Sequence, residues 1–206
     1  MLGHLRDYLA RQPACFTLLR KLIEFNFPTQ KHLIGKCLGN RVGLRVLDIG
    51  CGTGEFASVF AAHEYHGIDI SPAYIAYAQG HHQATFSVMD ATRLQFPDAS
   101  FEFVLVMAIL HHLPDHEALQ ALTEAARVLV PGGMLLVMED ARIPQLENRL
   151  VRLVQRYDKG EYMRSPDEYR RLMGEMFDAR WETTFRNGGC VYYAFHGVKL
   201  PPTSFR

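Results

Sequence analysis

The stretch that decides the fold is Arg45-Val46-Leu47-Asp48-Ile49-Gly50-Cys51-Gly52-Thr53-Gly54-Glu55-Phe56. Its apolar beginning predicts a buried strand, and the pattern after Gly54 predicts a helix that begins at Glu55. Phe56, Val59 and Phe60 would share the apolar face of that helix. The alternating glycines allow positive φ and close approach of a ligand to the backbone. Strand, glycine turn and helix in this order present backbone N–H groups to a ligand at the carboxyl end of an α/β sheet.

The spacing of these glycines indicates the class of ligand. A dinucleotide fingerprint needs a glycine three positions after its second one, and counting from Gly52 that position is Glu55. A P-loop is excluded because no Gly-Lys-Ser/Thr follows. The segment resembles the glycine loop of class I S-adenosylmethionine-dependent methyltransferases, whose form is Asp-x-Gly-x-Gly-x-Gly, here Asp48, Gly50, Gly52 and Gly54. The alternative is a glycine turn that binds no ligand.

Length and composition limit the other possibilities. The 206 residues suffice for one sizeable core and are too few for two ordinary domains. Basic and acidic residues balance at 22 each, so net charge indicates neither a nucleic-acid nor a membrane-surface partner. The longest apolar run, Phe103 to Leu110, is too short for a membrane span. Four scattered cysteines and an N-terminus without signal-peptide features predict a cytoplasmic protein.

Residues 1–43 precede the expected sheet and show helical periodicity. The pattern, with Pro13 and Pro28 as first-turn prolines, predicts three helices at about 3–11, 14–26 and 29–38. In the resembling family such helices pack over the cofactor pocket and help to form the substrate site. A helical cap that only covers one sheet face is the open alternative. The candidates for substrate contact in this region are Tyr8, Arg11, Arg20 and Lys21.

Beyond the glycine loop, strand and helix patterns alternate. Strands are predicted at 65–70, 84–89, 101–107 and 134–138, and a helix is predicted at about 72–81. A second helix is expected to be capped by Asp115 and to end at about 129, with Leu119 on its apolar face. Two further helices are expected at about 145–157 and 166–177. Asn187-Gly188-Gly189 joins runs 181–186 and 191–196 into a hairpin. This alternation predicts an α/β fold with a parallel, doubly wound sheet. With the hairpin it resembles the methyltransferase plan, which implies a three-layer, Rossmann-like sheet of seven mostly parallel strands with a C-terminal antiparallel strand.

The domain organisation follows from this order. We expect a single domain, with residues 1–43 as a helical cap, 44–206 as the cofactor-binding core, and 142–177 as a helical insertion that contributes to the substrate site.

Three aspartates lie at the ends of successive predicted strands, where α/β folds bind ligands. Asp69, on the second strand, can accept hydrogen bonds from ribose hydroxyls. Asp90, followed by Ala91, resembles the family's adenine contact, and Asp48 matches the position that orients the glycine loop and faces the cofactor's amino end. Each acid could instead cap a helix or a turn. The resemblance implies cofactor contacts at Asp48, Gly50, Cys51, Gly52, Gly54, Asp69, Ile70, Asp90, Ala91 and Met107.

Methyl transfer from a sulfonium mainly needs the nucleophile, methyl carbon and sulfur held in line. A base assists when the nucleophile still carries a proton. His112 follows the fourth strand, beside the methyl position in the resembling family, and is the candidate base. Its alternative is a structural histidine that holds the loop, and His111 is a weaker candidate. No histidine, cysteine and carboxylate spacing forms a recognised metal motif, so we expect no metal.

The acceptor side carries fewer patterns. The segment Ile109-Leu110-His111-His112-Leu113 resembles the subgroup that methylates small molecules, quinones and lipids, and it lacks the Asn/Asp-Pro-Pro-aromatic turn of enzymes that methylate nucleic-acid bases. Tyr162 or Arg164 is hypothesised to contact a polar or anionic substrate group. Two other functions stay open: a cofactor-binding regulator or partner subunit without turnover, and a nicotinamide dehydrogenase. The acceptor, the methylated atom and the oligomeric state are not predicted.

Overall fold

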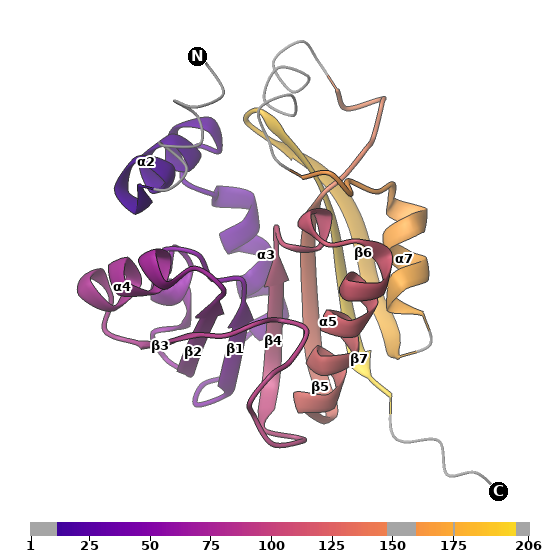
Figure 1. Ribbon diagram of the computed structural model, residues 1–206. Coiled ribbons are helices and arrows are strands. Elements are labelled where there is room, and N and C mark those ends of the chain that lie inside the picture. The colour runs from indigo at the N-terminus through magenta and orange to yellow at the C-terminus, as the bar shows by residue number, and fades with distance from the viewer. Residues whose placement is uncertain (1–11, 148–159, 175, 201–206) are drawn as a thin grey trace, which may run out of the picture.

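A seven-stranded sheet forms the centre of the molecule (Figure 1). The computed structural model describes residues 12–147, 160–174 and 176–200. The strand order is β3-β2-β1-β4-β5-β7-β6, and β7 runs antiparallel to both of its neighbours while the other pairs are parallel. The predicted mostly parallel sheet is therefore confirmed. The strands are β1 Arg45–Ile49, β2 Glu64–Asp69, β3 Thr85–Val88, β4 Phe101–Met107, β5 Leu129–Asp140, β6 Phe177–Asn187 and β7 Cys190–Lys199.

Helices cover both faces of this sheet, as the three-layer prediction requires. One core lies between the sheet and α5 and α7, and a second lies between the opposite face and α3, η1 and α4. Figure 1 shows α2 near the carboxyl ends of the parallel strands, the end where the strand arrows point. The helices are α2 Pro13–Ile23, α3 Pro28–Leu38, α4 Pro72–His81, α5 Asp115–Val128 and α7 Pro166–Met173, with 3-10 turns η1 Ala57–Phe60 and η2 Leu110–His112.

Strand β4 is apolar because both of its faces are covered. Val104 and Val106 pack into the core under α5, whereas Phe103 and Leu105 pack into the opposite core. All four side chains are at most 1% exposed. A strand buried on both faces loses the alternation of apolar and polar residues, which is why its sequence reads as a continuous hydrophobic run.

Prolines begin the helices where the sequence predicted them. Pro13 and Pro28 stand at the first turns of α2 and α3, where a missing N–H costs no helical hydrogen bond. Helix α2 is shorter than predicted because Phe25, Asn26 and Phe27 all take positive φ between 50° and 63°. The chain thereby reverses before α3. The predicted helix at 3–11 lies outside the described residues.

Three other helix predictions need correction. The helix expected from Glu55 is only the 3-10 turn η1, because residues 55–63 must also return the chain to β2 at Glu64. Helix α7 ends at Met173 because Gly174 turns the chain with a φ of 50°. Residues 144–146 form a turn where the 145–157 helix was predicted to begin, and 148–157 lie outside the described residues.

Helix α5 has a different start and a different apolar face from those predicted. Its N-cap is Pro114, and the Asp115 carboxylate pairs with Arg164 instead of capping the helix. Leu119, expected on the apolar face, is 47% exposed. The buried face recurs at helical spacing and consists of Ala118, Ala121, Leu122, Ala125 and Val128. Among the described residues, none of the helices has the length and apolar character that crossing a membrane requires.

Candidate functional site

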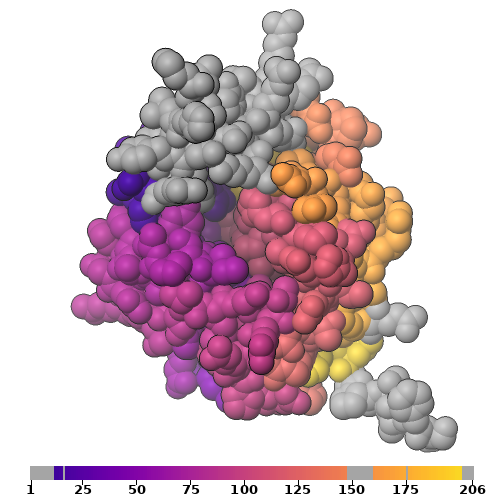
Figure 2. All heavy atoms as spheres, in the orientation of Figure 1, coloured from indigo at the N-terminus to yellow at the C-terminus, as the bar shows by residue number. Residues whose placement is uncertain are grey.

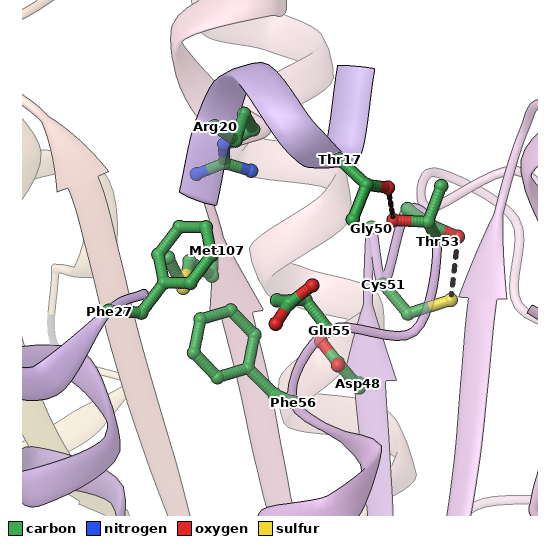
Figure 3. Close-up of a pocket in the computed structure, with 11 residues that line it drawn as sticks. Thr17, Arg20, Phe27, Asp48, Gly50, Cys51, Thr53, Glu55, Phe56 and Met107 are labelled. Carbon is green, nitrogen blue, oxygen red and sulfur yellow. Dashed lines mark hydrogen bonds between the residues drawn. The ribbon is translucent and has the colours of Figure 1, made fainter. Parts of the chain in front are cut away.

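A cavity lies at the carboxyl ends of β1 and β4, beneath helix α2 (Figure 3). Its walls combine the predicted glycine loop with Arg20 of α2, a predicted candidate for substrate contact, and with Thr17 of α2, which the sequence did not single out. In Figure 3, Arg20 and Thr17 project from the α2 side, and Asp48 and Glu55 lie on the opposite side. The lining residues are Thr17, Arg20, Phe27, Asp48, Gly50, Cys51, Gly52, Thr53, Glu55, Phe56 and Met107.

The glycine loop takes the backbone conformation that its sequence predicted. Gly50, Gly52 and Gly54 have φ values of 79°, 55° and 81°, all in the region that disfavours side chains. A Cβ on Gly50 would lie 2.0 Å from Cγ2 of Ile109, and one on Gly54 would lie 2.8 Å from the His82 ring. Apart from its two chain neighbours, no atom of the described residues lies within 4 Å of the Cβ position at Gly52. Two glycines therefore permit packing, and Gly52 leaves open space for a ligand.

Asp69 at the end of β2 holds this loop in place. Its Oδ2 accepts a hydrogen bond from Gly52 N at 3.0 Å, and its Oδ1 accepts one from Ser71 N at 2.8 Å. Burial raises the pKa of the Asp69 carboxyl, and these two N–H donors oppose that shift. The neighbouring Ile70 side chain is 71% exposed. In this arrangement the carboxylate can accept hydrogen bonds from a polar part of a ligand, while the exposed apolar side chain packs against a flat apolar part of the same ligand.

Asp90 lies one strand further along the same edge. Its Oδ1 accepts hydrogen bonds from the backbone N–H and the hydroxyl of Thr92, each at 2.8 Å, and the side chain is exposed. Met89 N donates to Asp69 O at 3.0 Å, which joins the ends of β3 and β2. Asp90 and Ala91 are therefore on the same sheet edge as Asp69, outside the cavity under α2.

Asp48 is the buried acid of the cavity. It accepts a hydrogen bond from the Tyr65 hydroxyl at 2.7 Å and is 1% exposed. Burial raises the pKa of Asp48 to about 7, against the lowering effect of the Tyr65 hydrogen bond. Cys51 and Met107 are buried beside it. Burial, with the Asp48 and Asp69 carboxylates, also raises the pKa of the Cys51 thiol, which makes Cys51 a neutral wall residue.

Helix α2 closes the cavity through contacts with the glycine loop. The Thr17 and Thr53 hydroxyl oxygens lie 2.6 Å apart, and Lys21 Nζ lies 3.1 Å from Glu55 Oε2. Of the predicted candidates in this region, Arg20 lines the cavity and Lys21 pairs with Glu55. Tyr8 and Arg11 lie outside the described residues.

The loop after β4 is organised by Glu139, a residue that the sequence did not single out. Its Oε1 accepts hydrogen bonds from Ile109 N and Leu110 N, both at 3.0 Å. Its Oε2 lies 2.8 Å from Nδ1 of His111. Glu139 is fully buried at the end of β5. One carboxylate thus fixes the backbone and one side chain of this loop, and a carboxylate partner makes Nδ1 the protonated nitrogen of His111.

Arg164 holds the carbonyl side of the same loop. Its five N–H groups reach the carbonyls of Leu110, Leu113 and Tyr162 and the carboxylate of Asp115, at 2.7 to 3.0 Å. The structure therefore gives Arg164 a role in fixing the loop, since a guanidinium has five donors in all, and the substrate contact of Arg164 stays a prediction.

The two remaining predicted residues lie at the surface of this region. The His112 side chain is exposed, with its ring centroid 4.1 Å from that of His111. Tyr162 is 40% exposed, and its backbone N–H donates to the carbonyl of His111 at 2.9 Å. Figure 2 shows a hollow between the magenta region that contains α4 and the rose region that contains η2 and α5. In the described part of the chain, no three histidine, cysteine or acidic side chains gather as metal ligands would.

Part of the chain is similar in sequence to known methyltransferases. Residues 46–133 match the family model described as a methyltransferase domain. An O-methyltransferase of Aspergillus nomiae is 38% identical over 127 residues, which cover 55% of this chain and 56% of that protein. A demethylmenaquinone methyltransferase of Staphylococcus aureus is 32% identical over 134 residues, 60% of this chain and 55% of that protein. The chain thus spans about half the length of the curated relatives it matches.

A solved structure supports the fold over almost the whole chain. Magnesium protoporphyrin IX methyltransferase from Synechocystis, with bound S-adenosylhomocysteine, superposes with a TM-score of 0.73. The match covers 97% of this chain and 100% of that one at 19% identity.

Proposed function

We propose that this chain, of which residues 46–133 match a methyltransferase domain, binds S-adenosylmethionine and transfers its methyl group to a small-molecule or lipid-like acceptor. One observation carries the proposal. The open side of Gly52, the Asp69 carboxylate bonded to Gly52 N and the buried Asp48 meet at the carboxyl ends of adjacent parallel strands. This is the edge at which α/β sheets bind ligands.

The residues present fit the chemical parts of this cofactor. Asp48 would hold the ammonium of the amino-acid part, because it is a buried acid inside the cavity. Asp69 would accept from the ribose hydroxyls. The exposed Ile70 would pack on the adenine ring, with Asp90 and Ala91 beside its polar edge. The glycine loop supplies the space, since a Cβ at Gly52 would project into it.

The bound cofactor supplies a methyl group on a positively charged sulfur, which is a good leaving group. The protein's share of the reaction is to align the acceptor nucleophile and exclude water. Met107 and the loop after β4 would form the wall beside the reacting atoms. Glu139 and Arg164 keep this loop rigid by binding its N–H and C=O groups.

We further propose that His112 removes the proton of an oxygen or nitrogen nucleophile. Its exposure on the rigid loop supports access to a bulky acceptor. His111 is buried against Glu139, which supports a positioning role for that histidine instead. Tyr162, half-exposed beside the same loop, remains the proposed acceptor contact of the 160–164 segment.

The acceptor class rests on the relatives and on charge. One relative is named as an O-methyltransferase and another as acting on demethylmenaquinone. The balanced charge of the chain supports an uncharged or lipid-like acceptor over a nucleic acid. An oxygen-linked proton on such an acceptor would suit a histidine base.

The first test is calorimetry with S-adenosylmethionine and S-adenosylhomocysteine. We expect micromolar binding by the wild type and a loss of about tenfold or more in Asp69→Ala, as a charge-assisted hydrogen-bond acceptor is removed. Asp98→Ala, which alters an exposed acid paired with Arg127, is the control and should bind as the wild type does. Absence of binding by the wild type would overturn the proposal. Cofactor consumption with a hydroquinone, a phenol and a free fatty acid then tests transfer.

A further inference from the structure

We propose that Arg20 binds the carboxylate of the cofactor's amino-acid part, and that a buried network centred on Glu24 aims its guanidinium into the cavity. The inference rests on the proposed function and adds a residue and a ligand group to it. Arg20 lines the cavity together with Asp48, Gly50 and Gly52 (Figure 3). It comes from the last turn of α2, twenty-five residues before β1 begins.

Glu24 fixes the direction of Arg20. Its Oε1 accepts from Arg20 Nε at 2.9 Å and lies 2.8 Å from Arg20 Nη2. Its Oε2 accepts from Gln30 Nε2 at 3.0 Å and from the Tyr192 hydroxyl at 2.6 Å. The Glu24 side chain is 2% exposed. A carboxylate with this many donors has a single orientation, so its arginine partner is held in one orientation as well.

The network extends into the β6–β7 hairpin. Asn187 Nδ2 donates to the Glu24 carbonyl and to Gln30 Oε1, both at 2.8 Å. A Cβ on Gly188 would lie 1.7 Å from the Ile23 carbonyl oxygen, so only glycine fits where the hairpin meets the end of α2. The hairpin therefore anchors the part of α2 that carries Arg20.

An aromatic ring supports the guanidinium from the other side. Arg20 Cζ lies 5.2 Å from the ring centroid of Phe27, which also lines the cavity. Guanidinium groups stack on aromatic rings while keeping their N–H groups in the guanidinium plane, where a carboxylate can meet them. The Arg20 side chain is 28% exposed, and it pairs with the buried Glu24, a charge that would be costly to bury unpaired.

The charges of the cavity complement a zwitterion. The cavity wall carries the acid Asp48 and the cation Arg20, which is also paired with Glu24, while Glu55 on the same wall is paired with Lys21. An α-amino acid presents an ammonium and a carboxylate on one carbon. Asp48 suits the first group and Arg20 the second, and bidentate arginine–carboxylate pairs are among the stronger polar contacts.

The test combines a residue change with a ligand change. Calorimetry compares S-adenosylhomocysteine with 5′-methylthioadenosine, which keeps the adenosine and the sulfur and lacks the amino-acid group. We expect Arg20→Met to weaken binding of S-adenosylhomocysteine by about tenfold or more and to change binding of methylthioadenosine by less than about twofold. Unchanged methylthioadenosine binding in the same sample also shows that the variant is folded.

Two further variants sharpen the result. Arg20→Lys keeps the positive charge but lacks the planar guanidinium group. Its affinity for S-adenosylhomocysteine should fall by an intermediate factor of about threefold to tenfold, and its affinity for methylthioadenosine should not change. Arg45→Met removes an arginine paired with Glu102 at the start of β1 and should bind both ligands as the wild type does.

The outcomes separate this inference from the proposed function. If the wild type binds neither ligand, the proposed function fails. The Arg20 inference alone is overturned if the wild type binds both ligands and the affinity of Arg20→Met for S-adenosylhomocysteine falls by less than about twofold. It is also overturned if the affinity of this variant falls equally for both ligands.

Discussion

The carboxylate of Glu139 lies 2.8 Å from Nδ1 of His111 and joins the end of β5 to the loop after β4. Both side chains are buried, with exposed fractions of 0% and 2%. The same carboxylate accepts backbone N–H groups of this loop, so its removal would leave several buried donors without an acceptor.

Glu139→Gln should therefore lower stability. The amide keeps one acceptor oxygen but places an NH₂ group against N–H donors, at an expected cost of about 2–4 kcal/mol in the free energy of unfolding. Urea unfolding measures this change. Glu117→Gln on α5, where the side chain is 45% exposed, is the matched control and should change stability by less than about 0.5 kcal/mol. Equal effects of both variants would contradict a structural role for Glu139.

Arg164→Lys should destabilise the same loop from its carbonyl side. A lysine cannot reach the carbonyls of both Leu110 and Leu113 with the geometry of a guanidinium. We expect the free energy of unfolding to fall by about 1–3 kcal/mol, because a buried carbonyl loses its hydrogen-bond donor. The lost ion pair with Asp115 adds little, because that carboxylate is exposed. Hydrogen exchange should become faster at residues 109–113. Arg170→Lys, an exposed pair with Glu182, should cost less than about 1 kcal/mol.

Asp48 should make stability depend on pH. Burial raises its folded pKa to about 7, whereas the unfolded value is close to about 3.9. Between these values the native state keeps a proton that the unfolded chain has released. Stability therefore falls as pH rises from about 4 to about 7 and shows no further loss from this group at higher pH.

Asp48→Asn removes this titration. Its unfolding free energy minus that of the wild type should increase across the same pH window and then level off. Urea unfolding at steps of about one pH unit measures the difference. A constant difference from acid to neutral pH would mean that Asp48 titrates at an ordinary pKa in the folded protein.

Gly52→Ala should separate binding from folding. Its φ of 55° disfavours alanine by about 1–2 kcal/mol, yet within the described part of the chain no atom beyond the adjacent residues lies within 4 Å of the new methyl group. The variant should fold and lose most of its affinity for S-adenosylhomocysteine, because the methyl group occupies the open side of the loop. Gly35→Ala is the control: it lies in the interior of α3, and outside that helix none of the residues that the structure describes comes within 4 Å of its Cβ position. It should raise stability by about 0.5–1 kcal/mol and leave binding unchanged. Full binding by Gly52→Ala would place the ligand elsewhere.

Sequence alone determined the parts of this protein that depend on local patterns. Periodicity predicted the parallel strands, and turn residues predicted the β6–β7 hairpin at Asn187. The spacing of Gly50, Gly52 and Gly54 predicted a loop with positive φ, and the structure confirms it. These features follow from the backbone conformations that single residues allow and from the periodic burial of one face of a helix or strand. Residues close together in the sequence are therefore sufficient to specify them.

Only the tertiary structure decided which polar side chains meet. Tyr192 and Glu24 are separated by 168 positions, and Arg164 and Leu110 by 54, yet each pair forms a hydrogen bond. In the sequence, Arg20 and Glu24 have the spacing of an ordinary surface pair on a helix. The burial of Glu24, and the partial burial of Arg20, depend on how α2 packs against the hairpin and the glycine loop. Long side chains have many orientations, and the packing of distant elements selects one of them. The sequence therefore predicted the glycine loop and not how the charged side chains around it pair.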